Sequence, residues 1–112
     1  MSIYDKSIIG KMANQFGNKI KQLRKHNHLL QRQVASQLDI DSPMLSKLER
    51  GDRKAKKEQV AQFAKVLKAN ADELLTLWLA DQLIEVVDGE YLALKAMLVA
   101  EEEVKYNSKK KR

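Results

Sequence analysis

Apolar residues recur along this chain at intervals of three and four, which is the period of an amphipathic helix. The first helix is expected on the apolar stripe formed by Met12, Phe16, Ile20 and Leu23. Asn27–Leu30 interrupts this stripe. Two short helices are expected next, Gln31–Leu38 and Ser42–Arg50, with inward positions at Val34, Ala35, Leu38, Leu45 and Leu48.

Local signals predict where the second short helix begins and ends. Asp39-Ile40-Asp41 has the composition of a tight turn, and either Asp41 or Ser42 is a suitable N-cap. Pro43 is accepted in a first turn, where the backbone N–H groups lack partners inside the helix. Gly51 is a natural C-terminal stop. These signals favour a helix of about nine residues.

Three more helices are expected in the second half. One carries the apolar stripe Val60, Phe63, Ala64 and Leu67. The next opens at an Asn70–Glu73 capping box and runs to about Val87. Asp88-Gly89 then breaks the chain before a last helix from about Glu90. Because no strand pattern or internal repeat is visible, the fold class is predicted to be all-α.

Charge is distributed unevenly along the 112 residues, whose net charge is +6. Residues 1–58 hold 13 Lys/Arg against 6 Asp/Glu, residues 59–104 hold 3 against 9, and residues 105–112 hold 5 against none. A basic first half is an electrostatic footprint for a polyanion, although a solubilising surface has the same composition. The absence of Cys excludes disulfides and fits a cytoplasmic location. No membrane span and no signal peptide are expected.

Two short helices joined by a three-residue turn have the geometry of a helix-turn-helix. Three pieces of this region resemble the Cro/phage-repressor (XRE-type) family: Ile20-Leu23-Arg24, Gln31-Val34-Ala35 and Ser46-Leu48-Glu49-Arg50-Gly51. They occur in the family's order and spacing within residues 18–76. The resemblance implies a five-helix lambda-repressor-like domain, here with a C-terminal helical extension, in a bacterial DNA-binding regulator that is not an enzyme.

The family also implies roles for individual residues. Arg24 and Glu49 match its buried or half-buried ion pair, the alternative being two solvated side chains. The helix 42–50 is expected in the major groove, with base-reading positions at Ser42, Pro43, Met44, Ser46 and Lys47. Lys47 is suited to guanine, and Met44 to a thymine methyl group. Pro43 departs from the family because it offers only apolar contact.

Phosphate contacts are expected on both sides of that helix. Gln31 matches the family's phosphate-binding glutamine at a helix start. A basic run follows the recognition helix, and its expected phosphate-binding residues are Arg50, Arg53, Lys54 and Lys56. A DNA backbone explains this concentration of charge, and a solvated basic loop is the alternative.

The sequence contains little that indicates catalysis, a cofactor or a metal site. His26 and His28 are separated by one residue, but no Cys or nearby carboxylate cluster completes a metal site. No nucleophile elbow, Gly-rich loop or acid–base constellation is present. We therefore expect no cofactor, no metal and no small-molecule ligand.

The chain is expected to divide into an arm (1–12), the DNA-binding domain (13–76), a helical extension (77–106) and a disordered basic tail (107–112). The extension has more apolar residues than one small core needs, which favours a homodimer through the C-terminal helices over a folded-back monomer. The predicted partners are thus double-stranded DNA and a second copy. An antitoxin or adaptor, a restriction-modification controller and a DNA-packaging protein remain alternative functions.

Overall fold

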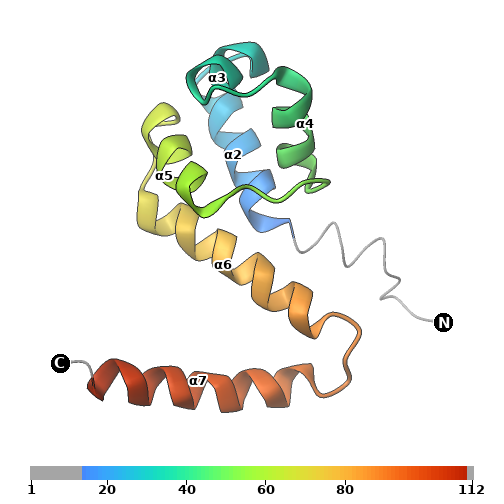
Figure 1. Ribbon diagram of the computed structural model, residues 1–112, viewed down its shortest axis with the longest axis vertical. Coiled ribbons are helices and arrows are strands. Elements are labelled where there is room, and N and C mark those ends of the chain that lie inside the picture. Colours follow the sequence, from blue (N-terminus) through green and yellow to red (C-terminus); the bar gives the residue numbers. More distant parts are fainter. Residues whose placement is uncertain (1–13, 111–112) are drawn as a thin grey trace.

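The computed structural model describes residues 14–110, in which all the regular secondary structure is helical. Its helices are α2 (Gln15–His26), α3 (Gln31–Gln37), α4 (Ser42–Arg50), α5 (Lys57–Val66), α6 (Ala71–Val87) and α7 (Ala93–Lys110). In Figure 1, α2 to α5 gather into a compact body and α6 leads away from it. Helix α7 runs back beneath α6 at an open angle. The predicted all-α class is confirmed.

The core lies where α2 meets the four helices that follow it. Phe16 of α2 meets Phe63 of α5 edge to face, with ring centroids 5.6 Å apart and an interplanar angle of 82°. Such a pair contributes about 0.5–1.5 kcal/mol beyond the area it buries. The other buried apolar side chains come mainly from the stripes that the sequence predicts: Ile20, Val34, Ala35, Leu38, Leu45, Leu48, Ala55, Val60, Ala64, Leu67 and Leu74.

Cap residues set the limits of α4 and α6. The Asp41 side chain accepts a hydrogen bond from the Met44 backbone N–H (2.7 Å), so Asp41 is the N-cap of α4. Gly51 ends α4 with a left-handed backbone (φ 83°), a conformation that side chains with a Cβ adopt at a cost. Asn70 caps α6 by accepting from the Glu73 N–H. The expected limits of the helix 42–50 are confirmed.

The C-terminal region differs from the expectation at two points. Helix α7 continues to Lys110, so residues 107–110 are helical and do not belong to a disordered tail. An apolar core is not required for this, because the polar residues that end α7 simply extend a helix already nucleated upstream. The predicted arm, Met12 and residues 111–112 lie outside the described residues. Within the described helices, none is long and apolar enough to cross a membrane.

Candidate nucleic-acid interface

Helices α3 and α4 form the two-helix unit from which the candidate interface is built. Val34 and Ala35 of α3 are buried, as are Leu45 and Leu48 of α4. Small Ala35 lets the two short helices approach, and the leucines fill the space towards the core. Because α4 uses only this inner side for packing, its opposite side remains available to a ligand.

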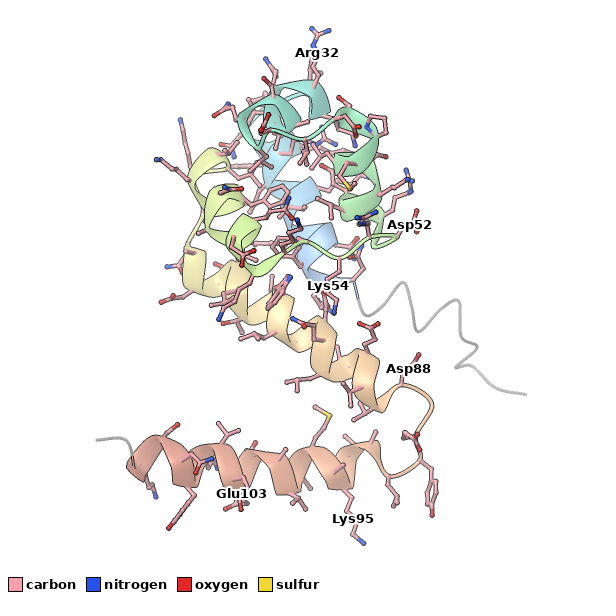
Figure 2. The ribbon with its side chains drawn as sticks, viewed as in Figure 1. Arg32, Asp52, Lys54, Asp88, Lys95 and Glu103 are labelled. Atoms are coloured by element: carbon pink, nitrogen blue, oxygen red, sulfur yellow. The ribbon has the colours of Figure 1, made fainter. Side chains whose placement is uncertain are left out.

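The five expected base-reading residues all lie on α4. Pro43 and Lys47 are exposed, while Ser42, Met44 and Ser46 are half-buried. They occupy the first six positions of the helix, which is the end that reaches base edges when such a helix enters the major groove. In Figure 2, α4 stands at one side of the domain with side chains directed away from α2.

Arg50 lies closer to the reading surface than the sequence indicated. Its Nη1 donates to the Ser46 hydroxyl (2.5 Å), and its Nε donates to Asp52 Oδ2 (2.9 Å). The Ser46 contact follows from the four-residue spacing, which brings two side chains to one face of a helix. Asp52 was not anticipated, and it places a carboxylate where a phosphate would compete for the same guanidinium.

Arg24, Gln31 and Glu49 form a partly buried network behind this surface. Arg24 donates to Glu49 through Nε (2.7 Å) and Nη2 (3.1 Å), and Gln31 Nε2 donates to Glu49 Oε1 (3.0 Å). Glu49 is 3% exposed and the Arg24 side chain 11%. Arg24 Nη1 also donates to the Leu29 carbonyl oxygen (3.0 Å). The network ties α2, the start of α3 and the end of α4 together.

This arrangement changes what Gln31 is expected to do. Its amide nitrogen already binds Glu49, so one of its two N–H groups remains for another acceptor. The contact also fixes the direction of the side chain. Arg32, its neighbour on α3, is exposed at the end of the domain (Figure 2) and was missed. Its position directly after a predicted phosphate-binding residue was the signal in the sequence that could have identified it.

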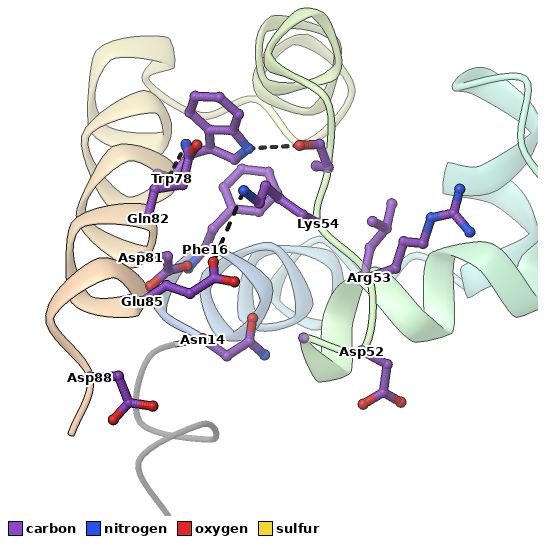
Figure 3. A pocket seen from close by; sticks show the side chains of 13 residues that line it. Asn14, Phe16, Asp52, Arg53, Lys54, Trp78, Asp81, Gln82, Glu85 and Asp88 are labelled. Carbon is purple, nitrogen blue, oxygen red and sulfur yellow. Dashed lines mark hydrogen bonds and ion pairs between the residues drawn. The ribbon is translucent and has the colours of Figure 1, made fainter. Parts of the chain in front are cut away.

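The basic loop after α4 is held against α6. Ala55 is buried, and its carbonyl oxygen accepts from Trp78 Nε1 (2.8 Å), as Figure 3 shows. Trp78 therefore packs on the DNA-binding domain, whereas the sequence placed it in the extension. This anchor leaves the flanking cations exposed, namely Arg53, Lys54 and Lys56.

These three cations differ in their surroundings. Lys54 Nζ lies 4.0 Å from Glu85 of α6, a contact between two largely exposed side chains. The Lys56 backbone N–H donates to Gln59 Oε1 (2.8 Å), which caps α5 and leaves the ammonium group outside. Within residues 14–110, Arg53 forms no ion pair. Arg53 is thus the cation of this loop that would give up the fewest existing contacts on binding a phosphate.

A cavity of about 340 Å³ adjoins the loop (Figure 3). Asp81 on its α6 side accepts the backbone N–H groups of Gln15 (2.8 Å) and Phe16 (2.9 Å), and so caps α2 from 65 residues away. Burial raises the pKa of the Asp81 carboxyl, against the lowering effect of these two hydrogen bonds. The cavity wall mixes cations with carboxylates and indicates no particular ligand.

The two histidines do not converge on a site. His26 and His28 are both exposed, and His28 has a left-handed backbone (φ 57°) in the turn after α2. Across residues 14–110, no three His, Cys, Asp or Glu side chains gather as metal ligands would.

Comparison with known proteins supports the same region. Residues 15–77, over half of the chain, match the family described as "Helix-turn-helix domain". No curated protein and no solved structure gives a significant match. The family match is consistent with the Cro/phage-repressor-like resemblance, and it spans α2 to the first half of α6. The matched range contains the α3–turn–α4 unit described above, so the chain belongs to the helix-turn-helix family, a fold typical of DNA-binding proteins.

Proposed function

We propose that this protein is a sequence-specific transcriptional regulator that places α4 in the DNA major groove. The observation that carries the proposal is the outer side of α4. It presents Ser42, Pro43, Met44, Ser46 and Lys47 around a helix start, while the inner side is fully used in packing. Hydroxyl, thioether and ammonium groups can together distinguish base edges.

Charge around α4 supports the same function. The exposed cations Arg50, Arg53, Lys54 and Lys56 follow the helix, and Arg32 lies beside Gln31 on α3. Phosphate contacts of this kind set the position and orientation of a domain on DNA, whereas the base contacts provide sequence selectivity. Gln31, held by Glu49, would bind a phosphate with its remaining N–H group.

The proposed regulator acts as a homodimer. Two α4 helices related by a two-fold axis would read half-sites about 34 Å apart, so the operator would be nearly palindromic. The apolar side chains that α6 and α7 leave exposed support association. A single α4 contacts only a few base pairs, and a second copy multiplies the discrimination.

Selection of bound sequences from a random DNA pool tests the function directly. A regulator should enrich a short motif, in two inverted copies if it binds as a dimer. A DNA-packaging protein would retain DNA without enriching a motif. An antitoxin or adaptor that does not use α4 for DNA would retain nothing above background in dilute salt, and either of these results would reject the proposal.

Lys47→Ala tests the assignment of the reading face. Loss of a base contact should weaken binding to the selected site by about 1–3 kcal/mol and relax selection at one base pair. Lys65→Ala is the matched control, because Lys65 is an exposed cation on α5, which Figure 1 places across α2 from α4. Unchanged base preference in Lys47→Ala would show that α4 contacts the bases through other residues or does not contact them at all.

A further inference from the structure

Helix α7 has no covering on any side. Every side chain from Leu94 to Lys109 is exposed, and Figure 1 shows the helix separate from the domain body. Its first two turns are almost entirely apolar, and they include Leu94 (78% exposed), Leu98 (63%) and Val99 (65%). Most helical stability in proteins comes from the packing of an apolar face, so α7 would gain stability from a packing partner.

The charges on one side of α7 are complementary to those on the same side of α7 in a second copy. Leu94 and Leu98 are four residues apart and share a face. Lys95 and Glu102, seven residues apart, both flank that face on the same side. Neither of them forms an ion pair within residues 14–110. We call these four residues the α7 stripe.

We propose that the α7 stripe pairs antiparallel with the α7 stripe of a second copy, centred near Leu98. In this register Lys95 lies opposite Glu102 of the partner subunit, and the two-fold axis repeats the pair. The Leu98 side chains of both copies then meet between the two ion pairs, and Leu94 lies just outside them. The inference deepens the proposed function, on which it rests for the use of the dimer, by naming the surface that joins two DNA-binding domains.

Charge favours the antiparallel direction over the parallel one. A parallel pairing through this face would set Lys95 against Lys95 and Glu102 against Glu102 of the partner subunit, and like charges in contact are destabilising. Antiparallel pairing instead sets Glu102 of one helix against Lys95 of the other.

A charge exchange in the full chain tests the register by sedimentation equilibrium without DNA. Lys95→Glu and Glu102→Lys should each weaken dimerisation about two- to thirtyfold, because each change disrupts two symmetry-related pairs. The double variant, which restores opposite charges across the axis, should recover most of the loss. Helix content and Trp78 fluorescence check that each variant is folded. A monomeric wild type at high micromolar concentration, or a double variant weaker than both single ones, would overturn the proposal.

Crosslinking between introduced cysteines supplies an independent test of the register. The chain has no Cys of its own, so only the introduced thiols react. With a short bifunctional thiol reagent, Leu98→Cys should crosslink to itself. Lys95→Cys and Glu102→Cys should each fail alone and crosslink when mixed. Efficient self-crosslinking of Lys95→Cys would demonstrate a parallel pairing and reject the register. Since these measurements need no DNA, their failure is separable from a failure of sequence selection.

Discussion

Removal of Arg24 is the most demanding test of how the DNA-binding domain is held together. Glu49 is 3% exposed and accepts three hydrogen bonds, two from Arg24 and one from Gln31. Arg24→Ala deletes two of the three and leaves a buried carboxylate with a single amide donor. Truncation of one partner in such a pair costs about 3–5 kcal/mol, because the remaining charge is buried without compensation. Domains of this size have about 5–15 kcal/mol of stability in total.

Urea unfolding at one fixed protein concentration, followed by far-ultraviolet circular dichroism, measures this cost. Lys21→Ala is the matched control, because Lys21 is an exposed cation on the same helix and should change stability by less than about 0.5 kcal/mol. The double variant Arg24→Leu/Glu49→Leu should lose less stability than the summed losses of Arg24→Leu and Glu49→Leu, since it leaves no unpaired charge. An Arg24→Ala chain as stable as Lys21→Ala, or strict additivity in the double variant, would refute the reasoning.

Three further predictions concern pH, packing and salt. The pKa of the Asp81 carboxyl is raised in the folded chain above its ordinary value of 3.8, so the folded state binds this proton more tightly than the unfolded state. The stability due to Asp81 therefore falls as the pH rises above that ordinary pKa. The unfolding free energy of the wild type relative to Asp81→Asn should therefore decrease over that range, and an increase would contradict the burial argument. Gly17→Ala would place a Cβ 2.6 Å from the Leu48 carbonyl oxygen, so α2 and α4 must separate at a cost of about 1–3 kcal/mol, seen as a lower melting temperature. Arg53→Ala should weaken binding to all DNA sequences alike and reduce the salt slope of log K by about one unit; a loss confined to the selected site would instead make Arg53 a base reader.

Local chemistry explains which features were predictable from the sequence. The limits of α4 follow from Asp41, Pro43 and Gly51, whose preferences operate within one helical turn. The core faces follow from three- and four-residue spacing, since the side of a helix that is buried is set by its own apolar residues. The positions of the expected reading residues on α4 depend on the same short-range rules.

Other features of the site depend on residues far apart in the chain. Asp81 caps α2 across 65 residues, and Trp78 anchors the loop at Ala55 across 23. A carboxylate in an apolar helix and a tryptophan in a leucine-rich one have many possible partners, so sequence alone could not choose among them. The resemblance implied the Arg24–Glu49 pair, but not the Gln31 contact that leaves this amide with one free N–H group.

The sequence by itself therefore determined the helices, their inner faces and the basic surroundings of α4, because propensity, capping and periodicity are short-range effects. Tertiary structure alone decided which polar groups meet in the interior and that α7 stands apart from the domain. Those outcomes depend on the relative placement of whole helices, which is set by the sum of many contacts between segments and not by any one segment.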